Sequence, residues 1–177
     1  MKDFILRHKA LYRIAIALRG FYYRTLGPRR LEDAARKQPL KIVVGASGIH
    51  DPGWIPTEIE YLNLMKPEHW SRFFKPDSID AILAEHVWEY LAKEEASFAA
   101  KICFRYLKPN GYLRVAVPDG FHPDPRYIEW VRVGGIGPGA DDHKILYTYK
   151  SLGAIFEAVG FKVVLCEYFD ESEVPLQ

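Results

Sequence analysis

The order of apolar and polar residues between Ile79 and Gly120 predicts a strand, a helix, a turn and a second strand. The run Ile79–Ala84 is short and mostly apolar, as in a parallel strand buried on both faces. After Leu91 the apolar residues recur at helical spacing, and a turn at residues 109–111 precedes a β-branched strand over Leu113–Val117. This order is typical of a right-handed βαβ unit, and such units build open parallel sheets. The chain is therefore expected to have an α/β fold.

Further elements follow from the same patterns. Lys41–Gly45 is the first strong strand, Trp54–Thr57 forms a short second strand, and Asn63 lies in a brief third one. Late in the chain, a helix capped by Thr148 ends at Gly160. The residues from Phe161 to Phe169 then form the next strand.

The N-terminal part differs from the rest, so we divide the chain into a helical segment over residues 1–38 and a domain over residues 39–177. Residues 1–41 hold 11 Lys/Arg against 3 Asp/Glu. Apolar and basic residues alternate at helical spacing up to Leu26, which predicts an amphipathic basic helix over residues 1–26 that Gly27-Pro28 ends. A short polar helix over Leu31–Lys37 follows. The first helix either lies on an anionic membrane surface or docks on the domain's own sheet or a partner.

Composition narrows the function classes. The chain has 177 residues, 49% of them apolar, which is enough for one sizeable core. The net charge of +1 and the absence of a recognition motif argue against nucleic acid as a partner. Two cysteines, Cys103 and Cys166, have no metal-ligand spacing and are expected to be reduced core residues of a cytoplasmic protein. No apolar run is long enough to cross a membrane, and no signal peptide is evident.

Polar side chains follow the predicted strands where ligands bind in sheets of this kind. Glu85 and His86 come directly after one strand, and Asp119 and His122 follow another. The alternative, that these side chains only cap helices or bond to loops, stays open.

The end of the first strand favours a nucleotide. Small residues at Gly45, Ala46, Ser47 and Gly48 let the backbone approach a ligand closely. Glu58, at the tip of the second strand, is placed to accept hydrogen bonds from a ribose diol, and the amide of Asn63 is suited to an adenine edge. The turn matches neither the dinucleotide fingerprint nor a P-loop.

Several motifs together carry a family resemblance over about residues 40–170. They are Val44-Gly45-Ala46-Ser47-Gly48, Gly53-Trp54-Ile55, Leu62-Asn63-Leu64, Ile79-Asp80-Ala81-Ile82, Glu85-His86-Val87-Trp88-Glu89, Leu107-Lys108-Pro109-Asn110-Gly111 and Val117-Pro118-Asp119. In these the chain resembles the small class I S-adenosylmethionine-dependent methyltransferases.

The resemblance implies a Rossmann-like three-layer sandwich with a mostly parallel sheet. It also implies that residues 45–48 pack against the methionine part of S-adenosylmethionine, that Glu58 holds the ribose and that Asn63 lies near the adenine. The resemblance further implies that Glu85 and His86 border the cofactor.

The sequence departs from the family pattern in three respects. The glycine turn is looser than usual, Tyr90 replaces a histidine, and the final antiparallel strand has no counterpart before Gln177. An unpaired sheet edge favours a dimer contact or a covering helix.

The resemblance directs attention to a proton acceptor, because methyl transfer to a hydroxyl requires alignment of the acceptor and removal of its proton. We expect His122 or His143 to be the general base, oriented by Asp119 or Asp142. The glycine-rich residues 134–139 between them suit a mobile lid. The spacing of these acids and histidines does not select a metal site.

Two functions remain in view. The favoured one is an S-adenosylmethionine-dependent methyltransferase for a small-molecule or glycan acceptor. The alternative is a catalytically inactive domain of the same fold that binds a partner.

Overall fold

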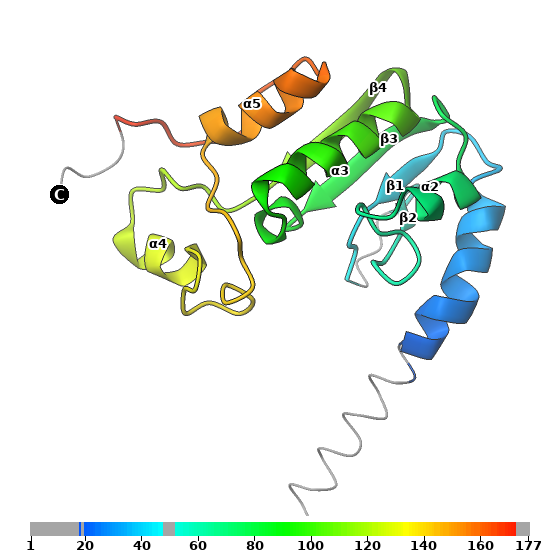
Figure 1. Cartoon of the computed structure of the whole chain (residues 1–177), viewed down its shortest axis with the longest axis horizontal. Helices are drawn as coiled ribbons and strands as arrows, with labels where there is room; N and C mark the ends of the chain where they lie inside the picture. The colour runs from blue at the N-terminus through cyan, green and yellow to red at the C-terminus, as the bar shows by residue number, and fades with distance from the viewer. Residues whose placement is uncertain (1–17, 19, 48–51, 173–177) are drawn as a thin grey trace, which may run out of the picture.

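The part of the chain that the structure describes forms a sheet of four parallel strands. The computed structural model describes residues 18, 20–47 and 52–172 (Figure 1). The strands lie in the order β2-β1-β3-β4. They are β1 (Lys41–Val43), β2 (Ile55–Pro56), β3 (Ile79–Glu85) and β4 (Leu107–Ala116), and every pairing between them is parallel. The predicted α/β fold with a parallel sheet is confirmed.

The helices follow the strands in sequence. They are a helix over residues 20–34, α2 (Pro67–Phe73), the short 3₁₀ helix η1 (Trp88–Tyr90), α3 (Lys93–Tyr106), α4 (Pro125–Val131) and α5 (Tyr149–Val159). Figure 1 shows α3 lying across β3 and β4.

The predicted βαβ unit is β3-α3-β4. Glu94 and Glu95 lie in the first turn of α3, where negative charge favours the helix dipole, and Glu95 accepts a hydrogen bond from the Ala92 amide at 2.8 Å. β4 begins at Leu107, earlier than the pattern predicts. Asn110 adopts a φ of 66° within this strand. The predicted turn is therefore a local irregularity inside β4 and does not precede the strand.

One face of the sheet contributes most of the main core among the described residues. Ile42 and Ile82 belong to the same buried cluster as Trp70 of α2, Cys103 of α3 and Phe156 of α5. On the other face Lys41, Val43 and Leu83 are half-buried and Arg114 is exposed, whereas the small side chain of Ala81 is buried. The described helices α2, α3 and α5 therefore share one side, and the third layer of the expected sandwich is missing from the described residues.

The prediction that Gly27-Pro28 ends the first helix is wrong, because one continuous helix covers residues 20–34. A Cβ atom on Gly27 would lie 2.5 Å from Cε1 of Tyr61, so glycine here permits close packing and does not terminate the helix. Leu31 is buried in the core cluster beside this contact. Most of the predicted 1–26 helix lies outside the described residues. Within them, no helix is both long and apolar enough to cross a membrane.

Two predicted strands do not form. The loop at Asn63 is a turn in which the Asn63 side chain accepts a hydrogen bond from the Met65 amide at 2.7 Å. The segment over residues 161–169 is irregular, since Phe161 packs on Phe104 and Phe156 without joining the sheet. Cys166 is consequently exposed, contrary to prediction, whereas Cys103 is buried as predicted.

The start of α5 and its end agree with the sequence pattern. The Thr148 hydroxyl accepts a hydrogen bond from the Ser151 amide, and Gly160 takes the left-handed conformation that closes the helix.

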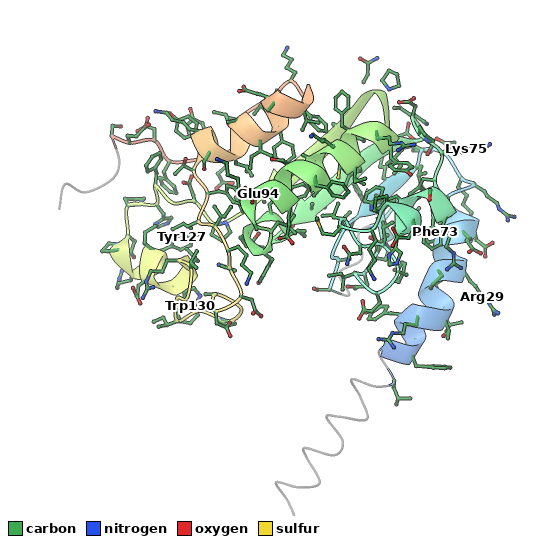
Figure 2. The ribbon with its side chains drawn as sticks, viewed as in Figure 1. Arg29, Phe73, Lys75, Glu94, Tyr127 and Trp130 are labelled. Atoms are coloured by element: carbon green, nitrogen blue, oxygen red, sulfur yellow. The ribbon has the colours of Figure 1, made fainter. Side chains whose placement is uncertain are left out.

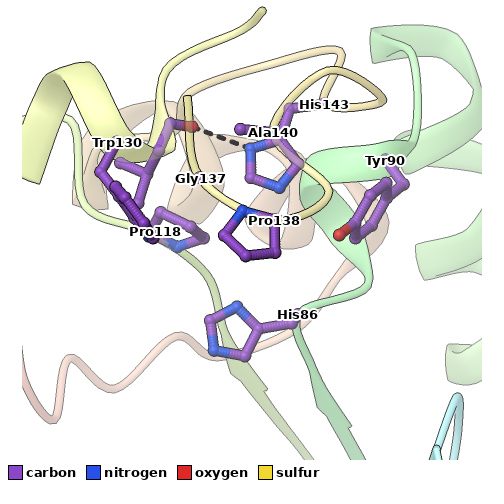
Figure 3. A pocket seen from close by; sticks show the side chains of 9 residues that line it. His86, Tyr90, Pro118, Trp130, Gly137, Pro138, Ala140 and His143 are labelled. Carbon is purple, nitrogen blue, oxygen red and sulfur yellow. Dashed lines mark hydrogen bonds between the residues drawn. The ribbon is translucent and has the colours of Figure 1, made fainter. Parts of the chain in front are cut away.

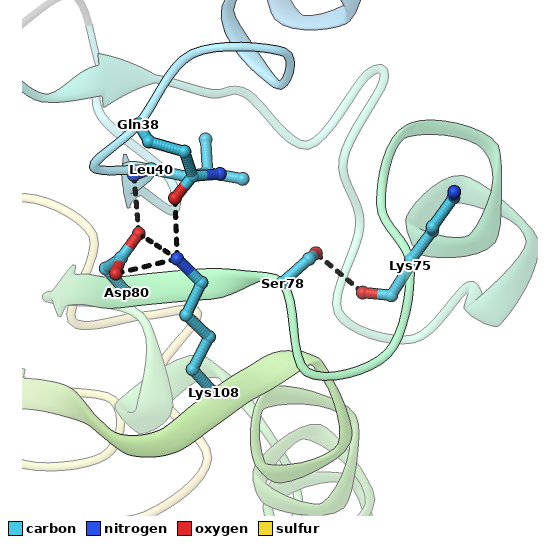
Figure 4. A network of polar contacts seen from close by, with 6 residues as sticks. All are labelled: Gln38, Leu40, Lys75, Ser78, Asp80 and Lys108. Carbon is cyan, nitrogen blue, oxygen red and sulfur yellow. Dashed lines mark hydrogen bonds and ion pairs between the residues drawn. The ribbon is translucent and has the colours of Figure 1, made fainter.

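Asp80 ties together the beginnings of three strands (Figure 4). Its carboxylate accepts hydrogen bonds from the Leu40 amide at 2.7 Å and from Nζ of Lys108 at 2.8 Å. The same Lys108 ammonium donates to Gln38. The hydrogen bond from Lys108, followed by the one from Leu40, lowers the pKa of Asp80.

We predict that Asp80→Ala lowers the free energy of unfolding by about 1 kcal/mol near neutral pH, the usual contribution of one such hydrogen-bonded group. Because the folded-state pKa is depressed, the contribution of Asp80 is present above the unfolded pKa and is lost as pH falls through the folded value. Urea unfolding of both proteins at about pH 7 and about pH 3 measures this difference. A difference that stays constant between the two pH values contradicts the assignment.

Candidate functional site

The carboxyl ends of the parallel strands meet at one edge of the sheet. β1 lies between β2, which follows it in sequence, and β3, which follows β2. The chain order therefore reverses between β1 and β3, and in open parallel sheets ligands bind in the crevice at such a reversal. The segments 44–47 and 85–87 flank this position.

The backbone on both sides of the reversal is in the left-handed region. Gly45 and Ser47 have φ values of 66° and 49°, and His86 across from them has a φ of 53°. Such values are unfavourable for residues other than glycine and often occur at functional sites. A Cβ on Gly45 would lie 3.1 Å from Cγ2 of Val87, so the two segments pack closely.

Thr57 joins the tips of β1 and β2. Its amide and its hydroxyl both donate to the Val43 carbonyl at 2.8 Å, and its carbonyl accepts from the Ala46 amide at 3.0 Å. These three hydrogen bonds place Glu58 beside the turn that contains Gly45, Ala46 and Ser47. Gly48 lies outside the described residues.

The Glu58 carboxylate lies in a buried environment. The residue is only 6% exposed, and Tyr61 packs next to it. Burial, and then the charge of Glu58, raises the pKa of the Tyr61 hydroxyl. Glu58 is thus shielded from water at the place where the sequence predicts a ribose contact.

Asn63 follows on the loop after Glu58. Its side-chain oxygen is engaged by the Met65 amide, and its backbone amide donates to Nδ1 of His69 at 3.2 Å. Its side-chain nitrogen has no hydrogen bond among the described residues, so it is available as a donor. The contact of Asn63 with adenine stays a prediction.

A cavity of about 320 Å³ lies farther along the same edge (Figure 3). It is lined by His86, Tyr90, Pro118, Trp130, Val131, Gly137, Pro138, Ala140 and His143. Tyr127 and Trp130 are side chains of α4 (Figure 2), which lies beyond the ends of β3 and β4. The volume is in the range of small-molecule sites.

His143 is buried in the wall of this cavity. Its Nδ1 lies 2.8 Å from the Val131 carbonyl oxygen, and its ring meets the Tyr90 ring edge to face at 4.9 Å. A carbonyl only accepts, so Nδ1 carries the proton and, in the neutral ring, Nε2 has the free lone pair. This orientation suits a proton acceptor.

His86 is paired with Glu89, a residue that the sequence analysis does not single out as a site residue. The Nδ1 atom of His86 lies 3.0 Å from Oε1 of Glu89, and the two side chains are 71% and 2% exposed. Three buried polar atoms without a partner lie on residues 88, 89 and 147: Trp88 Nε1, Glu89 Oε2 and Tyr147 OH. Burial, and then Glu89, raises the pKa of Tyr147 to about 12. A histidine followed three residues later by an acid is the signal that identifies the pair.

The predicted orienting pairs are not formed among the described residues. Asp119 accepts from the amides of Phe121 and Phe169, at 2.9 and 2.8 Å, and so fixes two loops. His122 instead accepts from the Asp124 amide at 3.1 Å and stacks on Tyr127 at 4.0 Å.

The remaining acidic candidates lie at the surface. Asp142 is exposed on the loop before His143. Glu85 is exposed and forms an ion pair with Arg114. Within the described part of the chain, no group of three acids, histidines or cysteines is arranged to hold a metal ion.

Comparisons with known proteins give one distant structural similarity. No family model matches the chain. No curated protein matches it significantly. A crystal structure of a SAM dependent methyltransferase from Archaeoglobus fulgidus is similar at a TM-score of 0.49 and 15% sequence identity, over 78% of this chain and 69% of that chain. A similarity of this size does not assign an activity.

We predict that Gly45→Ala is more destabilising than Gly53→Ala. Both glycines have positive φ, so each alanine costs about 1 kcal/mol from the backbone alone. Nothing lies within 4 Å of a Cβ at Gly53, whereas a Cβ at Gly45 presses on Val87.

Urea unfolding of the two variants measures the difference. In the Val87→Ala background the cost of Gly45→Ala should fall to that of Gly53→Ala. Equal costs in the wild-type background contradict close packing between the two strand ends.

Proposed function

We propose that this protein is an S-adenosylmethionine-dependent methyltransferase acting on a small-molecule or glycan acceptor. One observation carries the proposal, namely that two sites lie along the same edge of the sheet. The Gly45–Ser47 turn and Glu58 lie where the strand order reverses, and a cavity lined by two histidines lies farther along this edge. A nucleotide cofactor and an acceptor bound there would be neighbours.

The side chains fit the chemistry of the cofactor. The Glu58 carboxylate is an acceptor for ribose hydroxyls, and the side-chain nitrogen of Asn63 is a donor for the adenine. In this proposal the backbone of residues 45–47 would contact the methionine part, with Glu85 and His86 at the border. When bound, S-adenosylmethionine would supply an electrophilic methyl group for transfer to the acceptor.

The chain's own contribution to catalysis is to exclude water, align the acceptor and remove its proton. His143 has an unprotonated Nε2 on the cavity wall, and His86 is held by Glu89. His122, with its ring stacked on Tyr127, is the predicted alternative base. A positioned proton acceptor typically contributes about 10² to 10⁴ in rate.

The burial of Glu58 favours a second candidate function. A carboxylate with 6% exposure has little surface to offer a ribose. A catalytically inactive domain that uses this fold to bind a partner has no need of an open cofactor site. In such a domain we expect side chains such as Trp54 or His50 to fill the cofactor site. The Trp54 ring lies 5.8 Å from Nζ of Lys41, and His50 lies outside the described residues.

We predict saturable binding of S-adenosylmethionine and S-adenosylhomocysteine by calorimetry, weakened at least about tenfold by Glu58→Ala because the ribose loses its charged acceptor. Glu60→Ala is the matched control, since Glu60 is an exposed acid two residues away. It should leave the affinity unchanged. Absence of binding by the folded wild-type protein would reject the enzyme and favour the partner-binding domain.

A further inference from the structure

We propose that the cavity beside His86 binds a protonated amine and that the acceptor of the proposed methyl transfer is therefore an amine. This inference rests on the proposed function for the transfer itself, but the amine site stands on its own observations.

The charges around the cavity are the first of these observations. Neither lysine nor arginine is among its lining residues. The Glu89 carboxylate directly behind His86 is 2% exposed, and its Oε2 has no partner. A buried charge that is only half compensated attracts a cation and repels an anion. The arginines of α4 and its C-cap, Arg126 and Arg132, are already paired with Asp124 and Glu129.

The surrounding acids act in the same direction. Burial, followed by the charges of Glu89, Asp142 and Asp141, raises the pKa of Tyr90. The Tyr90 hydroxyl at the cavity wall therefore lies in a negative potential. An acceptor bearing a carboxylate or phosphate would enter this potential with no lysine or arginine among the lining residues to offset it.

The walls offer the contacts that an ammonium group prefers. Figure 3 shows the rings of His86, Tyr90 and His143 grouped around Pro138, with Trp130 opposite. Faces of tyrosine and tryptophan attract cations. The Nε2 atom of His143 is a hydrogen-bond acceptor, because its Nδ1 donates to Val131.

The His86–Glu89 pair can also accept the proton that the bound ammonium group must lose before methyl transfer. With Nδ1–H directed at Glu89, Nε2 of His86 is unprotonated. The ammonium N–H bond breaks, the proton joins Nε2, and the lone pair remains on the amine nitrogen. Glu89 stabilises the resulting imidazolium, so it is a positioning residue that acts through His86. His143 has a carbonyl partner only and lacks this stabilisation.

The test is a nuclear magnetic resonance titration without cofactor, followed at the Trp130 indole N–H. Three ligands of matched size serve as probes: 2-phenylethylamine, 2-phenylethanol and phenylacetate. The amine should bind at least about tenfold more tightly than the alcohol, and phenylacetate should bind most weakly. Glu89→Gln should weaken amine binding about tenfold and leave alcohol binding within about twofold.

Alcohol binding equal to amine binding, tighter binding of phenylacetate, or no saturable amine binding overturns the proposal. If Glu89→Gln does not fold, the wild-type series still decides. An amine preference in a protein that does not bind S-adenosylmethionine rejects the methyltransferase and keeps the amine site. Cofactor binding together with an alcohol preference rejects the amine site and keeps the methyltransferase.

The N-terminal helix carries a second, independent inference: we infer that its exposed apolar face binds an anionic lipid surface. The helix over residues 20–34 docks on the domain through Gly27 and Leu31. Leu18 and Phe21, on the other side at helical spacing, are 63% and 68% exposed. The helix therefore contacts the domain with one face and exposes Leu18 and Phe21 on another.

Sequence and charge favour lipid as the occupant. The 11 Lys/Arg against 3 Asp/Glu in residues 1–41 complement anionic headgroups. An apolar stripe with basic residues around it is typical of helices that lie in the membrane interface.

Co-sedimentation with phosphatidylserine-phosphatidylcholine vesicles tests this surface. The full chain should bind these vesicles and bind pure phosphatidylcholine at least about tenfold more weakly. The double variant Leu18→Glu/Phe21→Glu should lose binding. Val164→Glu, at an apolar residue that is 72% exposed elsewhere, should not. No binding, or equal loss in Val164→Glu, overturns the inference, and binding of a protein partner instead would point to a docking helix.

Discussion

The parallel pairing of β1 with β3 is the constraint on which the site depends. These strands are not consecutive, since the chain passes through β2 and α2 before returning to the other side of β1. Their register, Ile42 beside Ile82 and Val43 beside Leu83, fixes how far each strand extends at the carboxyl edge. The turn after β1 and the left-handed His86 after β3 are brought together by this register. A one-residue slip would turn the buried residues of β3 to the open face.

The elements that the sequence predicts well are those whose conformation is determined by residues close together in sequence. α3 has acids in its first turn and a continuous apolar face, and α5 has both of its caps. Gly27 shows the limit of this approach. Glycine before proline is normally a helix terminator, but here the contact with Tyr61 determines the residue, and Tyr61 is 34 positions away in sequence. The strand predicted over residues 161–169 does not form either, and Phe161 packs instead on Phe104, which is distant in sequence, and on Phe156.

The candidate site divides in the same way. That Glu58 and the Gly45 turn lie near each other follows from the strand order, which a βαβ pattern predicts. Which acid orients which histidine does not follow, because it depends on side-chain contacts across loops. Asp119 is the natural partner for His122 in sequence, yet its two oxygens are taken by the amides of Phe121 and Phe169. The acid that does meet a histidine is Glu89 of η1, only three residues after the left-handed His86.

Burial makes Glu89 more informative than the exposed acids. Removing a carboxylate from water costs several kcal/mol, and one neutral imidazole at the surface offsets only part of that cost. The exposed pairs Asp124–Arg126 and Glu129–Arg132 require little desolvation. Their presence is therefore weak evidence for a functional site. Glu89, Trp88 and Tyr147 together retain unused hydrogen-bonding capacity in the interior. Such capacity is normally satisfied by water or by a ligand, and the charge of Glu89 favours a cation over an anion in the cavity that its partner His86 lines.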